Sequence, residues 1–73
     1  MGKLSNVSGK DAVKAFEKIG WTVRGQVGSH RVLTKSGVQA NLTVPMHTEL
    51  AQGTLGGLLK IAGLTVDEFR SLL

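Results

Sequence analysis

Cysteine is absent from this 73-residue sequence, and aromatic residues, acids and long apolar runs are scarce. The missing cysteines exclude a disulfide scaffold, a cysteine-ligated zinc finger and a thiol nucleophile. No apolar run approaches the ~20 residues of a membrane span. The first residues, Met1–Asn6, contain neither a signal-peptide hydrophobic region nor a myristoylation pattern. We therefore expect a cytoplasmic protein with no membrane partner.

Most enzyme signatures are missing as well. The sequence has no Walker A loop, no G-x-G-x-x-G and no G-x-S-x-G elbow, and its five acids are too scattered for a catalytic carboxylate pair. Its two histidines lack H-E-x-x-H spacing and suitable flanking acids, so we expect no metal and no cofactor. The aromatic residues stand at core-like positions, which argues against the base-stacking platforms of RRM and OB-fold proteins: Phe16, Trp21 and Phe69.

Positive charge is what the sequence has in excess. Its 41% hydrophobic and 19% charged residues are typical of a folded domain, and we expect one domain over residues 1–73. The net charge of +4 in so small a domain indicates a polyanionic partner, most often nucleic acid. Residues 1–35 carry seven basic residues and two acids (+5), and residues 36–73 carry two and three (−1). An ordinary soluble surface with a chance excess of lysine is the alternative.

The first element is predicted to be an amphipathic helix over residues 9–19. Ser8 is its expected N-cap, and Asp11 adds a carboxylate to the first turn. Gly20 follows where a left-handed residue usually ends a helix. Basic residues recur every four positions and form one stripe along this helix: Lys10, Lys14 and Lys18.

The apolar period then changes from 3.6 to 2, which predicts three strands. Glycines at both ends of Gly25–Gly28 and the Ser36–Gly37 pair indicate turns. Proline cannot donate to a sheet ladder, so Pro45 is expected to end the last strand. The predicted strands span residues 21–24, 29–35 and 38–44.

A loop over residues 46–53 is expected to lead to a second helix with Thr54 as its N-cap and Gly63 as its end. Its apolar positions are Leu55, Leu58, Leu59 and Ala62. Gly56–Gly57 inside this helix is locally unfavourable, so either something packs very close there or the helix is frayed. A capping box of Thr65 and Glu68 predicts a last helical turn or two.

The predicted order is α-β-β-β-α with a helical tail, an α+β fold. Its simplest form is a three-stranded antiparallel sheet packed on helices on one face. The other face is then solvated and available for a ligand.

Two histidines are the candidates for chemistry, because histidine transfers protons near neutral pH. Strand alternation puts His30, Val32 and Thr34 on one face, and Arg31, Leu33 and Lys35 on the other. Pairing across Ser36–Gly37 sets Lys35 opposite Val38 and His30 opposite Thr43, with His47 a few residues beyond. Such a histidine could deprotonate a ribose 2′-hydroxyl or protonate a leaving oxygen, while Arg or Lys stabilises the phosphoryl charge. A surface or packing histidine without a catalytic role is the alternative.

Short motifs in a fixed order resemble a known family. They are Ser8-Gly9-Lys10, Gly20-Trp21, Gly28-Ser29-His30, Val44-Pro45-Met46-His47, Gly53-Thr54-Leu55, Ala62-Gly63-Leu64 and Glu68-Phe69. Each is weak alone, but their order and spacing from Leu4 to Leu73 resemble the HicA (YcfA-like) mRNA interferases, toxins of HicAB toxin–antitoxin pairs. The resemblance implies a double-stranded-RNA-binding-domain-like fold, ribosome-independent cleavage of mRNA, and a HicB antitoxin. Our leading hypothesis, from His30 in its motif and the +5 charge of residues 1–35, is that this cleavage is metal-independent. DNA would be contacted only indirectly, through the antitoxin complex.

The resemblance also assigns residues. The histidine of the Gly-Ser-His motif, His30, carries over as the catalytic residue, while Ser29 and His47 take possible supporting roles. Gly28 would let the RNA backbone approach closely. With the basic residues, the expected RNA-binding set is Lys10, Lys14, Lys18, Arg24, Gly28, Arg31 and Lys35. A non-catalytic, double-stranded-RNA-binding module of the same fold, or a domain whose relevant surface faces only HicB, remain the competing hypotheses.

Overall fold

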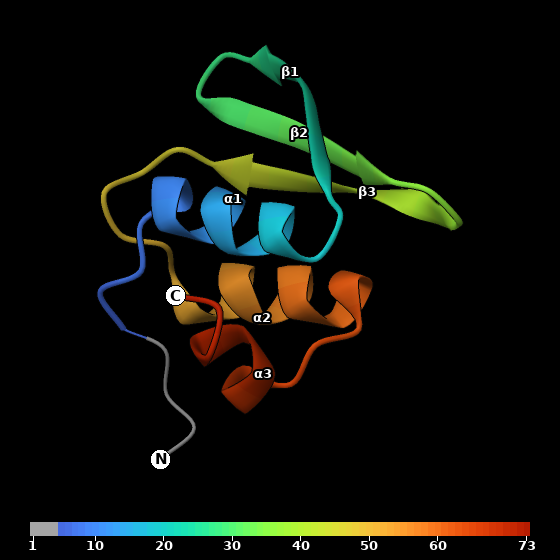
Figure 1. The fold of residues 1–73 in the computed structure, drawn as a ribbon. Coiled ribbons are helices and arrows are strands. Elements are labelled where there is room, and N and C mark those ends of the chain that lie inside the picture. Colours follow the sequence, from blue (N-terminus) through green and yellow to red (C-terminus); the bar gives the residue numbers. More distant parts are fainter. Residues whose placement is uncertain (1–4) are drawn as a thin grey trace.

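A computed structural model describes residues 5–73 and shows helices packed on one face of a three-stranded antiparallel sheet (Figure 1). The expected α+β fold with the α-β-β-β-α order of a double-stranded-RNA-binding domain is confirmed. Residues 1–4, including the start of the expected domain and Leu4 of the resemblance, lie outside the described residues. The elements are α1 (Gly9–Lys18), β1 (Thr22–Val27), β2 (His30–Lys35), β3 (Val38–Pro45), α2 (Gln52–Ala62) and α3 (Val66–Arg70).

Helix α1 begins and ends where its local signals predict. The Ser8 hydroxyl accepts a hydrogen bond from the Asp11 backbone N–H at 3.0 Å. Gly20 follows the C-cap residue Ile19 with φ of +102°, a conformation that favours glycine. The helix therefore has a defined start, which matters because the site described below lies against it.

The first predicted strand and turn are wrong in extent. Instead of ending at residue 24, β1 continues to Val27, so Gly25 lies in a strand and not in a turn. The pairing with β2 shifts between Val23 and Gly25, and this bulge accommodates the glycine within the ladder. The turn is confined to Gly28 and Ser29, with Gly28 at φ of +60°, and β2 begins at His30.

The predicted pairing of Lys35 with Val38 is confirmed, but that of His30 with Thr43 is wrong. His30 lies opposite Pro45. The reason is an irregularity in the hairpin: one residue between Leu33 and Lys35 faces residues 39–41 of β3. This shift brings the segment after Pro45 closer to His30 than simple hairpin counting predicts.

Helix α2 starts earlier than predicted, and Thr54 is not its N-cap. Ala51 is the N-cap residue and has no side chain that caps the helix. The Leu50 backbone N–H donates to the Val7 carbonyl oxygen at 2.7 Å, and Leu50 is buried, so the chain is already fixed for the helix to begin at Gln52. This long-range contact leaves no visible sign in the local sequence.

The end of α2 and the start of α3 are confirmed. Gly63 ends α2 at φ of +74°. The Thr65–Glu68 capping box is complete, with hydrogen bonds of 2.8 Å and 3.1 Å. Among residues 5–73, none of the helices combines the length and apolar character that a membrane crossing requires.

One hydrophobic core lies between the sheet and the helices. The three aromatic residues are buried in it, as predicted, and the Phe16 and Phe69 rings lie 5.3 Å apart. Phe69 thus joins α3 to α1 across the core. The largest fully buried side chains are Phe16, Phe69, Leu33, Leu42, Leu55 and Val44.

The two glycines within α2 are not needed for close packing. A Cβ atom built at Gly56 or Gly57 would have no neighbour within 4 Å, and both residues are exposed. The close-packing explanation is therefore wrong, and the helix runs through both residues.

Replacing these glycines should stabilise the protein. Gly56→Ala and Gly57→Ala should each raise the free energy of unfolding by about 0.5–1 kcal/mol, because alanine lowers the conformational entropy of the unfolded chain and meets no steric obstacle. Urea denaturation followed by far-UV circular dichroism measures this change. A loss of stability in both variants would mean that the outer face of α2 is not open.

Candidate functional site

Three segments that are distant in sequence meet at one end of the sheet. His30 is the exposed first residue of β2, between Val27 of β1 and Pro45 of β3. The Met46 backbone N–H donates to the Ser29 carbonyl oxygen at 2.7 Å. The Gly9 backbone N–H, at the start of α1, donates to the His47 carbonyl oxygen at 2.9 Å. We call this place, formed by Ser29, His30, Met46, His47 and the start of α1, the histidine corner.

The packing of α1 against β3 depends on the absence of a side chain at Gly9. A Cβ atom there would clash with the Pro45 carbonyl oxygen and lie 2.8 Å from the Met46 Cα atom. The helix can start this close to the chain only with glycine at that position. Lys10 therefore follows directly beside the histidine corner, with its side chain exposed.

The two faces of the sheet have different characters. Leu33 of β2 is paired with Leu42 of β3, and both are fully buried against the helices. Alternation therefore turns His30, Val32 and Thr34 to the opposite side, which no described helix covers (Figure 1). We call this side the open face.

The basic residues of the sheet are divided between these faces. Arg24 lies in the β1 bulge, and its Nε donates to the Thr34 hydroxyl at 3.0 Å, so it is on the open face with His30. Arg31 and Lys35 share the alternation of Leu33 and are on the helix side. The Arg31 Nε donates to the Gln26 side-chain oxygen at 3.2 Å.

Arg31 also contributes to the turn before His30. Gln26, its partner, donates through Nε2 to the Gly28 carbonyl oxygen at 3.0 Å. These two hydrogen bonds, from Arg31 to Gln26 and from Gln26 to Gly28, connect the turn to the strands. Gly28 is exposed, with no neighbour within 4 Å of a Cβ atom, so the backbone can be approached closely here.

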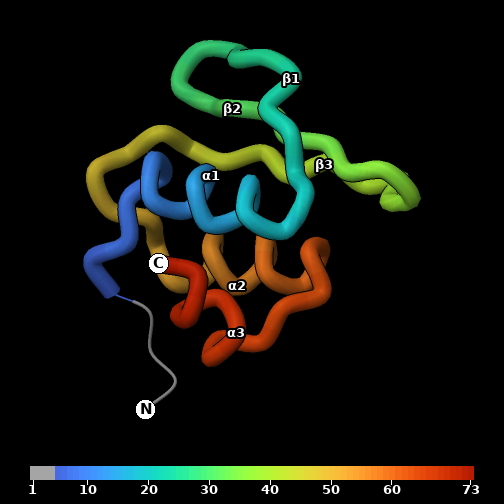
Figure 2. The backbone as a smooth tube through the Cα atoms, in the orientation of Figure 1, coloured from blue at the N-terminus to red at the C-terminus, as the bar shows by residue number. Residues whose placement is uncertain are grey.

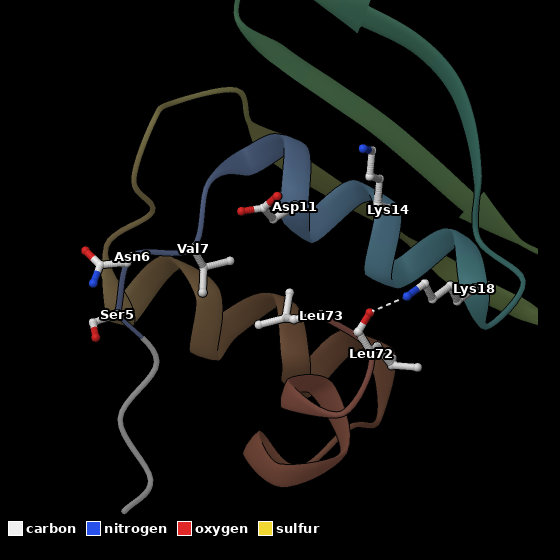
Figure 3. A pocket seen from close by; sticks show the side chains of 8 residues that line it. All are labelled: Ser5, Asn6, Val7, Asp11, Lys14, Lys18, Leu72 and Leu73. Carbon is white, nitrogen blue, oxygen red and sulfur yellow. Dashed lines mark hydrogen bonds between the residues drawn. The ribbon is translucent and has the colours of Figure 1, made fainter.

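The lysine stripe of α1 does not lie on one surface with His30. Only Lys10 is next to the histidine corner. The Lys18 Nζ donates to the Leu72 carbonyl oxygen at 2.7 Å, which ties the C-terminal residues to α1 (Figure 3). Lys14 and Lys18 line a pocket of about 360 Å³ whose other lining residues are Ser5, Asn6, Val7, Asp11, Leu72 and Leu73. Neither histidine belongs to this pocket.

A charge pattern that the comparison of sequence halves did not reveal runs through the sheet. No Asp or Glu occurs between Glu17 and Glu49, so the three strands, their turns and both histidines are free of acids. Within residues 5–73, no basic side chain of the sheet forms an ion pair with a carboxylate. Counting acids along the chain, instead of net charge per half, would have located this surface.

The histidine corner offers proton transfer and hydrogen bonding. In the described part of the chain, no three His, Cys, Asp or Glu residues come together as metal ligands. The residues joined there by backbone hydrogen bonds carry two exposed imidazoles and the Ser29 hydroxyl, and Lys10 follows Gly9 on α1. Their chemistry suits an anionic substrate whose reaction requires proton transfer.

The family comparison agrees with this layout. A family model described as HicA toxin of bacterial toxin-antitoxin matches residues 9–64. The chain belongs to the HicA toxin family. A comparison with curated proteins gives no significant match. The predicted family is thus confirmed, and the protein has the role of a toxin with a cognate antitoxin partner.

The match to the HicA toxins covers the whole site. It starts at Gly9, the first residue of α1, and ends at Leu64, just after α2. All three strands and both histidines lie within it. Helix α3 lies beyond the matched segment, although its Phe69 completes the core of this HicA toxin.

Substitution of Gly9 should lower the stability of this HicA toxin and displace the backbone at the histidine corner. Gly9→Ala should lower the free energy of unfolding by about 1–3 kcal/mol, because the added methyl group overpacks the contact with Pro45 and Met46. Urea denaturation measures the loss, and chemical shifts of the His47 amide report the displacement. Gly57→Ala is the matched control, for which we expect a gain, and equal effects of the two substitutions would contradict the proposed role of Gly9.

Proposed function

We propose that this HicA toxin is a ribosome-independent, metal-independent endoribonuclease that cleaves mRNA with His30 as its catalytic histidine, and that a HicB antitoxin neutralises it. The observation that carries the proposal is the histidine corner: two exposed histidines at one end of a sheet without acids. Family membership supports the toxin role. The chemistry of the corner supports RNA as its target.

RNA cleavage requires a base and an acid, and the corner holds two groups that can take these roles. The base removes a proton from a 2′-hydroxyl or from a water molecule, whose oxygen then attacks the phosphorus atom. The bond from phosphorus to the 5′-oxygen breaks, and the acid gives that oxygen a proton. Proton transfer of this kind contributes about 10²–10⁴-fold to a rate. We assign His30 to one of these steps and a supporting role to His47.

The surroundings of His30 suit an RNA backbone. Gly28 and Ser29 form an exposed turn directly before it, and the Ser29 hydroxyl can donate to a phosphate oxygen. Lys10 directly follows Gly9, which makes it the lysine of α1 nearest to this corner, and its charge can stabilise charge that develops on the phosphoryl oxygens. No carboxylate of the strands competes with the phosphate for these groups.

A non-catalytic RNA-binding module is the second candidate, because the absence of acids from the sheet suits RNA binding without any chemistry. It predicts binding that weakens with added salt and no cleavage product at any protein concentration. The presence of two exposed histidines in neighbouring segments favours cleavage over this alternative, since binding alone needs no group that transfers protons.

Replacement of His30 separates the two candidates. Because His30 is exposed, His30→Ala should leave the melting temperature unchanged within about one degree. RNA cleavage should fall by at least about 100-fold, since a proton-transfer group is lost. End-labelled RNA incubated in the presence of EDTA measures this loss, and analysis of the 3′ ends distinguishes 2′-hydroxyl attack from attack by water.

Two further variants complete this experiment. His47→Ala should reduce cleavage less than His30→Ala, in keeping with a supporting role. Lys60→Ala, an exposed substitution on α2, controls for the loss of one charge. Full activity of the His30→Ala variant, or activity that disappears with EDTA, would contradict the proposed mechanism.

A further inference from the structure

Arg24 is a cation on the open face, and the structure holds it in place there. The bulge between Val23 and Gly25 breaks the strict alternation of β1. The Arg24 Nε donates a hydrogen bond to the Thr34 hydroxyl at 3.0 Å, and this bond connects Arg24 to β2. Its remaining guanidinium N–H groups have no hydrogen-bond partner within the described residues, and the side chain is exposed.

The Arg24 guanidinium lies far from the histidine corner along the sheet. Thr34, which holds it, is four residues beyond His30 on β2, a separation of about 13 Å along a strand. A phosphate that reacts at His30 cannot reach Arg24 at the same time. Any phosphate held by Arg24 must belong to a different nucleotide of the same RNA.

The part of the open face between Arg24 and His30 carries no charged side chain. It is formed by Gly25 of β1, Val32 of β2 and Thr43 of β3, which are neighbours across the sheet. A Cβ atom at Gly25 would meet nothing within 4 Å, so the backbone of β1 is open to contact. Three strands spaced about 4.8 Å apart make a surface roughly 10 Å wide, which suits one nucleic-acid strand better than a duplex. Figure 2 shows the β1–β2 hairpin projecting away from the helices, so the helices leave this side accessible.

We infer that the open face between His30 and Arg24 is a track for single-stranded RNA, in which Arg24 binds a phosphate remote from the scissile bond. Thr34 is the positioning residue, because it holds the guanidinium on the face that carries His30. Arginine suits this task, since its planar group can donate two hydrogen bonds to one phosphate. The inference deepens the proposed function and rests on it for the position of the scissile bond.

RNA binding tests the track independently of cleavage. The probe is fluorescein-labelled hexauridylate, titrated by fluorescence anisotropy against the His30→Ala protein over a range of KCl concentrations. Adding Arg24→Ala should raise Kd about tenfold or more, as expected for a lost charge-assisted contact. The slope of log K against log salt should fall by about 0.7, the value for one phosphate contact on a single strand.

Two variants make the test specific. Thr34→Val keeps the shape of the side chain but removes the acceptor for Arg24, so its effect on Kd should be smaller and in the same direction. Lys60→Ala removes one charge from α2, on the helix side. It should cause neither the tenfold rise in Kd nor the fall in slope that we expect of Arg24→Ala. Circular dichroism of each variant confirms that the fold is retained.

Substrate length provides the second readout, with His30 intact. The ratio of kcat/KM for the hexanucleotide to that for a dinucleotide should fall about tenfold in Arg24→Ala, mainly through KM. Equal effects of Arg24→Ala and Lys60→Ala would overturn the track. A variant that binds RNA normally but loses affinity for the antitoxin would also overturn it, and would assign the face to the protein partner. Cleavage that is unaffected by His30→Ala would refute the proposed function, whereas the Arg24 binding result would still stand.

Discussion

The contact between the start of α1 and the chain after β3 is the constraint on which the site depends. The Gly9 N–H bonds to the His47 carbonyl oxygen, and the Cβ position of Gly9 is occupied by the Pro45–Met46 backbone. The helix and the strand end are therefore held at backbone distance. This contact defines where the chain carrying His47 passes, and the Met46–Ser29 bond then joins it to the residue before His30. The corner is thus built by main-chain groups, which leaves its side chains free for a ligand.

Local signals were sufficient for some elements of this fold and not for others. The cap at Ser8, the glycine at Gly63 and the Thr65–Glu68 box each act within one helical turn, and each lies where the sequence predicts it. The start of α2 depends instead on Leu50 bonding to Val7, which lies more than forty residues away. No local pattern reports such a contact, so the sequence alone points to Thr54 although the cap is Ala51.

The arrangement of the site residues also depends on contacts that local sequence patterns do not report. Strand alternation correctly separated His30 from Arg31, because it needs only the period of two. The residue opposite His30 on β3 depends on the register shift between Leu33 and Lys35, which counting back from the hairpin turn does not include. This shift of two residues places Pro45, and not Thr43, opposite His30. The lysine stripe was correctly placed on one helix, but the sequence could not show that Lys18 is bound to Leu72, whereas the residue before Lys10, Gly9, is bound to His47. Residue type and period identify candidates, whereas their grouping depends on tertiary contacts.

The division of the sheet into a packed face and an open face also bears on neutralisation. A toxin must be active alone and silent in its complex. If His30 and Arg24 both act from the open face, a partner that lies on this face excludes RNA by occupying the same surface, and the toxin need not change its own conformation. The lack of acids between Glu17 and Glu49 favours an acidic partner surface for the same reason that it favours RNA. Competition of this kind makes neutralisation depend on the relative affinities and concentrations of RNA and antitoxin, and a remote phosphate contact at Arg24 would shift that balance towards long RNA.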